Sequence, residues 1–203
     1  MGASTRSQVP AAGLLISREV VADEELLARW RDGDAGAGET LFERHFEPLC
    51  WFFRNKTPDH VQELVQETML ACVEIRDSRQ LRCGFRAYMF AIARNKLVDH
   101  YRRRTRDEAA FDPNLVSIHD VLPTPSRIIA KDDEHRRLIE ALRTLPIDTQ
   151  VLLELFYWEE LTGPELAVAL GDPEGTIRTR LRKARKDLRA LLDESTAMPP
   201  EPS

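Results

Sequence analysis

Residues 162–185 decide the fold class, and they read Thr162-Gly-Pro-Glu-Leu-Ala-Val-Ala-Leu-Gly-Asp-Pro-Glu-Gly-Thr-Ile-Arg-Thr-Arg-Leu-Arg-Lys-Ala-Arg185. Thr162 and Glu165 have the spacing of a capping box, which predicts that a helix begins there. The pattern predicts a short helix over 164–170, a glycine turn and a long helix over 173–192. This is the layout of a helix-turn-helix, whose second helix enters the major groove of DNA. A helical hairpin with a solvated basic face is the alternative.

The predicted long helix has an apolar side and a basic side. Its apolar positions are Ile177, Leu181, Ala184 and Leu188. Base contacts in a groove come from the start of such a helix, where Arg can pair with guanine edges and Thr can touch a thymine methyl group. We therefore expect four residues of the basic side to contact DNA: Arg178, Thr179, Arg182 and Lys183.

A second basic helix is predicted far from the first, over 91–106. It holds six Arg or Lys against one Asp between Arg94 and Arg106, and the long helix holds seven against one between Arg178 and Arg189. Thus 13 of the 29 basic residues lie in two short windows of a chain whose net charge is -5. Because binding responds to the local field of a patch, this concentration favours a polyanionic partner.

One face of the second basic helix mixes arginines with shorter polar side chains. At 3.6 residues per turn this face lies opposite Leu97 and Tyr101, and it comprises Asn95, Asp99, Arg102, Arg103 and Arg106. Arginines suit phosphates, while Asn and Asp can reach base edges or hold a neighbouring loop. The alternative is the solvated end of an amphipathic helix.

The length and composition of the chain limit the class of protein. A chain of 203 residues with 42% hydrophobic and 31% charged residues is typical of a globular protein. Cys50, Cys72 and Cys83 lack metal or redox spacing and favour structural thiols in a reducing cytoplasm. We find neither a signal peptide nor a membrane-spanning stretch. The five histidines have no ligand spacing, and no catalytic grouping stands out, so we expect no metal, no cofactor and no enzymatic activity.

The expected architecture is all-α, with two small helical domains on a flexible acidic linker. Residues 1–22 form a flexible tail, and 23–106 form a first domain in which glycines break the chain at 33–38 and Pro48 introduces a kink or a restart. Residues 107–134 form the linker, with seven acidic residues against two basic ones. Residues 135–195 form the second domain, and 196–203 form a disordered tail.

Three motifs, in order, resemble those of the extracytoplasmic-function (group IV) sigma factors of bacterial RNA polymerase. Asp59-His-Val-Gln-Glu-Leu-Val-Gln-Glu-Thr68 resembles the family's polymerase-clamp-binding helix. Phe85-Arg-Ala-Tyr-Met-Phe-Ala-Ile-Ala-Arg-Asn-Lys-Leu-Val-Asp-His-Tyr-Arg-Arg103 resembles its minus-ten helix, and residues 165–185 resemble its minus-thirty-five helix-turn-helix.

The resemblance implies a sigma factor that binds core RNA polymerase, recognises two promoter elements and helps to melt the downstream one. It implies that Asp59, Glu63, Gln66 and Glu67 dock on a basic coiled coil of the largest subunit, although a solvated acidic face is the plain alternative. Asn95, Arg102 and Arg103 would contact the non-template strand, and residues 76–84 would capture a flipped base, at a cost of unstacking. The implied partners are the two largest polymerase subunits and promoter DNA, with an anti-sigma factor as a further candidate.

The chain departs from the family pattern at several positions. Tyr88 and Met89 stand where Trp-Leu is common, and Gly163-Pro164 replaces a more usual polar pair. Asp172 replaces an apolar residue of the turn, and an Asp before Pro173 could cap the recognition helix. These changes bear on the angle between the two helices.

Two other classes of function are weaker. A stand-alone helix-turn-helix regulator accounts for residues 135–195 but leaves the polar face of 59–67 and the first basic helix without a role. An enzyme acting on nucleic acid lacks a phosphate-binding glycine loop, a carboxylate pair and a Ser/His/Asp grouping.

Overall fold

The computed structural model describes residues 21–74, 76–77, 84–105, 111–122 and 133–197. Over these residues the chain folds into α-helices and one short 3-10 helix, η1, which confirms the all-α prediction. The elements are α1 (Asp23–Arg31), α2 (Ala35–Arg54), η1 (Pro58–His60), α3 (Val61–Glu74), α4 (Phe85–Arg104), α5 (Ile118–Val121), α6 (Asp133–Thr144), α7 (Ile147–Tyr157), α8 (Gly163–Leu170) and α9 (Glu174–Ala197).

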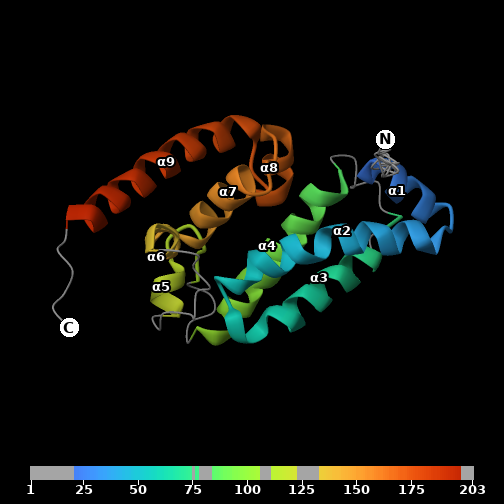
Figure 1. Ribbon diagram of the computed structural model, residues 1–203, viewed down its shortest axis with the longest axis horizontal. Helices are drawn as coiled ribbons and strands as arrows, with labels where there is room; N and C mark the ends of the chain where they lie inside the picture. Colours follow the sequence, from blue (N-terminus) through green and yellow to red (C-terminus); the bar gives the residue numbers. More distant parts are fainter. Residues whose placement is uncertain (1–20, 75, 78–83, 106–110, 123–132, 198–203) are drawn as a thin grey trace, which may run out of the picture.

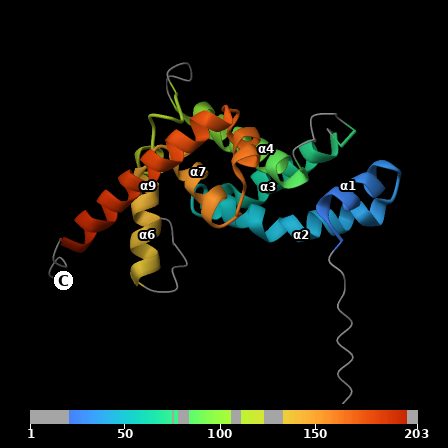
Figure 2. The same cartoon turned by 90° about the horizontal axis from the view of Figure 1, so that it is seen from above.

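The first four α-helices pack together as a bundle, with α1 and α2 on one side and α3 and α4 on the other (Figures 1 and 2). Their three- and four-residue spacing of large apolar side chains places Leu41, Phe53 and Phe90 in a fully buried core. Aromatic rings meet edge to face within it, as between Phe52 and Phe53, whose centroids lie 5.1 Å apart. This packing holds α3 and α4 side by side, so the two sequence motifs they carry lie on neighbouring surfaces.

The expected break at the glycines is only partly correct. Gly33 has a φ of 99° and ends α1, but α2 begins at Ala35 and contains the other two glycines. Gly38 packs against Trp30 so closely that an added Cβ would lie 2.5 Å from the indole ring. A glycine is needed there for the approach of α1 to α2, not for a break. Helix α2 also continues through Pro48 without restarting.

The second group of helices contains the predicted helix-turn-helix, formed by α8 and α9. Thr162 and Glu165 form the expected capping box, with the Thr162 amide donating to the Glu165 carboxylate at 2.8 Å. Gly171 adopts the left-handed conformation that ends α8. Ile177, Leu181 and Ala184 are buried, so the apolar side of α9 faces the domain core as predicted.

Part of the expected flexible linker is folded. Residues 111–122 bury Phe111 and Ile118 and form α5, which begins with a capping box between Ser117 and Asp120. Their backbone carbonyls also accept from the first amides of α7, at 2.9 Å from Ile147 to Val116. The prediction of a flexible tether is therefore wrong for residues 111–122. The sequence did not indicate this fold, because the buried apolar residues of the segment do not recur with a helical period.

The two helical groups also contact each other directly. Figures 1 and 2 show α8 beside α4, and these helices share the most extensive contact between any two elements. The two domains are therefore packed against each other in this structure, and the contact covers part of the surface of each domain.

Candidate nucleic-acid interface

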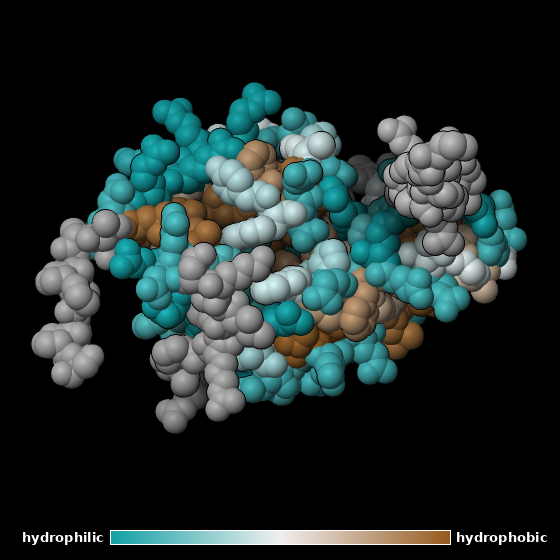
Figure 3. All heavy atoms as spheres, in the orientation of Figure 1, coloured by the Kyte–Doolittle hydropathy of each residue, from teal (hydrophilic) through white to brown (hydrophobic). Residues whose placement is uncertain are grey.

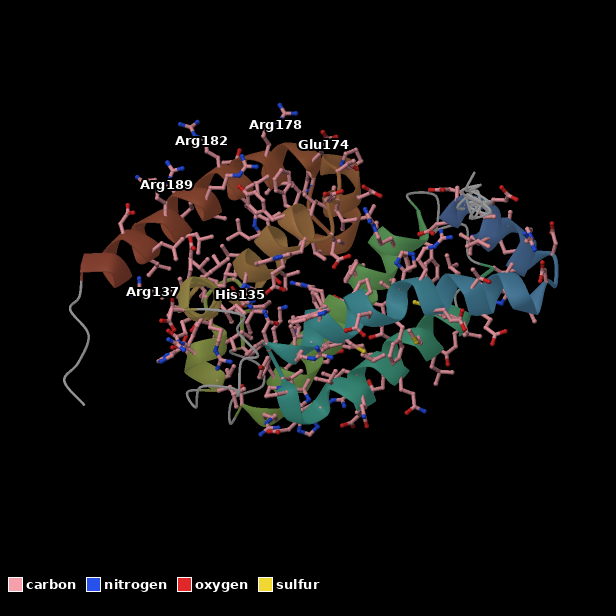
Figure 4. All side chains as sticks on the ribbon, in the orientation of Figure 1. His135, Arg137, Glu174, Arg178, Arg182 and Arg189 are labelled. Carbon is pink, nitrogen blue, oxygen red and sulfur yellow. The ribbon has the colours of Figure 1, made fainter. Side chains whose placement is uncertain are left out.

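The four predicted contacts of α9 lie together on an open face. Arg178, Thr179, Arg182 and Lys183 are all exposed. Figure 4 shows Arg178, Arg182 and Arg189 extending away from the body of the molecule. Only a long contact of 3.9 Å joins Arg178 to Glu174, and its side chain is 84% exposed. This face carries the positive charge and the reach that a groove-binding helix needs.

Two further arginines of α9 have structural roles that the sequence did not indicate. Arg180 forms an ion pair with Asp172 and donates to the Asn114 side chain at 3.1 Å, which joins the turn to the folded linker segment. Arg185 stacks over the Phe156 ring at 4.7 Å. Asp172 thus binds the recognition helix through Arg180, a different role from the cap expected for it.

The predicted face of α4 is present in part. Asn95, Arg102 and Arg103 are exposed, and Arg102 forms an ion pair with Asp99 at 2.9 Å. Both side chains of this pair are almost half exposed, so water and salt screen it strongly. The pair leaves Arg102 free to exchange its partner for a phosphate. Arg106 lies outside the described residues.

The predicted polymerase-docking residues lie on η1 and α3. Asp59, Glu63 and Gln66 are exposed, whereas Glu67 is half-buried and forms an ion pair with Lys96 of α4 at 3.1 Å. Two apolar residues that sequence reasoning missed continue the same face of α3. Leu70 and Val73 follow at helical spacing and are 58% and 44% exposed. Figure 3 shows hydrophobic surface over α3. The face is thus acidic at one end and apolar at the other.

A shallow pocket connects the faces of α3 and α4. It is lined by residues of both helices, including Glu63, Glu67, Lys96, Asp99 and Arg103. The His60 and His100 rings lie 4.6 Å apart beside it. Burial, together with the nearby charges of His60 and Arg104, lowers the pKa of His100. Among the described residues no group of His, Cys, Asp and Glu could hold a metal ion.

Arg94 of the predicted basic run has its partners within the protein. Its Nε donates to Asp148 Oδ1 at 2.8 Å and its Nη2 donates to Oδ2 at 2.5 Å, which makes a two-pronged ion pair between α4 and α7. Its Nη1 donates to Asn95 Oδ1 at 3.1 Å. The second domain therefore contacts α4 through Arg94, directly beside the predicted minus-ten surface.

A second ion pair crosses the domain contact deeper in the molecule. The Lys56 ammonium is fully buried and binds the Glu154 carboxylate, whose side chain is 8% exposed. Lys56 also donates to the Phe52 carbonyl at 2.6 Å, while Asn55 and Gln150 donate to Glu154. Burial lowers the pKa of Lys56, and the charge of Glu154 opposes that shift.

Each of the two helical domains matches a known protein family. The family described as Sigma-70 region 2 matches residues 41–107, and the family described as Sigma-70, region 4 matches residues 135–188. The ECF RNA polymerase sigma factor RpoE of Cereibacter sphaeroides is 32% identical over 77% of this chain and 86% of that protein. The chain belongs to the ECF RNA polymerase sigma factors.

A solved structure and a second relative agree with the membership. The sigma factor CnrH of Cupriavidus metallidurans is 30% identical over 85% of this chain and 95% of that protein. The structure of CnrH in complex with the cytosolic domain of CnrY matches with a TM-score of 0.63 at 26% identity, covering 86% of this chain and 99% of that one.

Membership decides between the classes of function considered above. This protein is a sigma factor that directs RNA polymerase to promoters, and it is not a stand-alone helix-turn-helix regulator. The region 2 match covers most of α2 together with α3 and α4, and the region 4 match covers α6 to α9 except the first two residues of α6 and the end of α9. In the part of the chain that the structure describes, no helix is both long and apolar enough to cross a membrane.

Proposed function

We propose that this sigma factor uses three separate surfaces for core polymerase and the two promoter elements. Asp59, Glu63 and Gln66 dock on the largest subunit, with Leu70 and Val73 as the apolar part of that contact. The face of Asn95, Asp99, Arg102, Arg103 and Arg106 binds the non-template strand at the minus-ten element. The face of Arg178, Thr179, Arg182 and Lys183 reads the minus-thirty-five element.

The separation of charge carries this proposal. Although the net charge is -5, exposed arginines gather on α4 and α9, while the exposed end of α3 is acidic. Basic faces attract DNA and an acidic face attracts a basic protein surface, so each surface is complementary to a different partner. Glu67 has a smaller part in docking than expected, because Lys96 already neutralises it.

The remaining assignments rest on family membership. Capture of a flipped base belongs to residues 76–84, most of which lie outside the described residues. The domains run over 23–106 and 135–195, and residues 111–122 join the second domain. We assign the chain to the cytoplasm together with polymerase, and we assign it no cofactor and no enzymatic step. We also propose an anti-sigma factor as a partner, since the sigma factor RpoE of Bartonella quintana, whose fold is similar, has been solved with the anti-sigma factor NepR.

A gel-shift experiment with and without core polymerase tests the proposed function. Promoter fragments are selected from the host genome by the holoenzyme and are then offered to the isolated chain. We expect tight, specific and strand-opening binding only when core polymerase is present. Equally specific binding by the isolated chain would instead favour duplex recognition without polymerase.

Substitutions of the recognition helix test the role of α9. Arg178→Ala and Arg182→Ala are each expected to weaken binding of holoenzyme to the upstream element by roughly 1–3 kcal/mol, the value of one two-pronged base contact. The measurement is competition between promoters that differ only in that element. Arg137→Ala is the matched control, because Arg137 is also exposed but lies on α6, away from the recognition face (Figure 4). An unchanged promoter preference removes both arginines from the site.

A further inference from the structure

The ion pair between Arg94 and Asp148 lies at the edge of the proposed minus-ten surface. Arg94 directly precedes Asn95 on α4, and its guanidinium binds Asp148 with two nitrogens and Asn95 with the third. A carboxylate held by the fork of an arginine offers the same oxygens and the same charge as a nucleic-acid phosphate. Asp148 is 2% exposed at its side chain, so it occupies Arg94 away from water.

We propose that the closed arrangement is a resting state in which Asp148 holds Arg94 in place of a phosphate, and that opening on polymerase frees Arg94 to bind the non-template strand beside Asn95. This inference rests on the proposed function. It adds Arg94 to the minus-ten surface as a further phosphate contact, and it makes Asp148 the internal competitor of that phosphate.

The backbone around Asp148 fixes the competitor in place. The Asp148 amide donates to the Pro113 carbonyl at 3.0 Å, and the Ile147 amide donates to Val116 at 2.9 Å. The folded linker segment thus binds the first turn of α7, from which the Asp148 side chain reaches α4. Since Asn114 of the same segment accepts from Arg180, the linker connects the helix-turn-helix to the contact with α4.

The buried polar groups of the domain contact make it suitable for replacement by contacts with a partner. The domain contact holds the buried Lys56–Glu154 pair, and burial raises the pKa of the Glu159 carboxyl. The buried Oε1 of Gln150 has no hydrogen-bond partner among the described residues. Ions and polar atoms regain water when the domains separate, so these polar contacts contribute little net free energy to closure. A partner that offers its own contacts can therefore open it.

The geometry of a promoter requires such an opening. Elements at minus ten and minus thirty-five are roughly 80 Å apart along B-DNA at about 3.4 Å per base pair. A compact chain of this length has a diameter of only about 45 Å. The closed domains therefore cannot contact both elements at once, so binding of both elements requires the domains to separate.

Binding of a single-stranded probe by the free chain tests the competition. A fluorescent oligodeoxythymidine is titrated with wild type and with Asp148→Asn, which keeps the size of the side chain and removes its charge. We expect Asp148→Asn to bind about tenfold more tightly, as a charged hydrogen-bond partner of Arg94 is lost. The gain should vanish in the double variant Arg94→Ala with Asp148→Asn. Asp133→Asn is the control, because it removes the same charge from an exposed pair on α6.

A second measurement covers the case in which Asp148→Asn does not fold. Arg94→Ala holoenzyme should bind core normally but form open complexes several-fold less well, which a residue that only joins the domains would not do. The inference is overturned if folded Asp148→Asn binds the probe no better than Asp133→Asn, or if Arg94→Ala opens promoters like wild type. If wild type forms no holoenzyme, the proposed function fails, while the probe titration still reports on closure.

Discussion

The variant that combines Glu63→Arg with Gln66→Arg is expected to lose holoenzyme formation while keeping its helical circular dichroism. Both side chains are exposed on α3, and Glu63 pairs with the partly exposed His60 at 3.0 Å, so we expect their replacement to leave the buried packing of the first domain intact. We expect the docking surface of polymerase to be basic, as the family resemblance implies, so two arginines would turn attraction into repulsion at the proposed contact. Like charges opposed across an interface cost several kcal/mol.

The control for this variant has the same charge change and the same spacing elsewhere. Thr40→Arg with Glu43→Arg places two arginines three residues apart on the exposed side of α2. Co-elution with core polymerase on size exclusion is expected for the control and not for the α3 variant. Co-elution of both variants at wild-type levels would contradict the assignment of the α3 face.

The second large effect concerns the buried pair between the domains. Glu154→Ala leaves the fully buried Lys56 ammonium without its carboxylate, which should destabilise the closed arrangement by about 3–5 kcal/mol. Separation of the domains returns Lys56 to water and costs less than unfolding. We therefore expect a larger radius of gyration in small-angle scattering, with unchanged helical content.

Two comparison variants separate charge from shape at this site. Lys56→Met with Glu154→Leu replaces both ions by apolar side chains of similar size and should restore the compact form. Arg136→Ala removes an exposed pair on α6 and should change stability by less than about 1 kcal/mol. If Glu154→Ala scatters like wild type, the buried pair does not hold the domains together.

The features that the sequence predicts well are local ones. The capping box at Thr162, the left-handed Gly171 and the apolar side of α9 depend on residues a few positions apart, and all three are present. The all-α class follows from the same periodicities. Such signals survive folding because a helix face is defined within its own turns.

The features that the sequence misses depend on tertiary neighbours. Arg94 and Asp148 are 54 residues apart, and nothing in either neighbourhood indicates that they pair. Arg180 and Arg185 count toward a basic stripe, yet one binds Asp172 and the other covers Phe156. Gly38 reads as a helix breaker but provides room for Trp30. Charge counts therefore overestimated how many of the cations on these helices are free of partners within the chain.

Initiation by a reconstituted holoenzyme tests the central claim most directly. Core polymerase transcribes a library of host genomic fragments with and without this chain, and the transcript 5′ ends are sequenced. We predict discrete start sites that depend on the chain and lie downstream of two shared elements at a fixed spacing, with the upstream element losing its influence in the Arg178→Ala, Arg182→Ala double variant. Start sites identical to those of core polymerase alone would contradict the account.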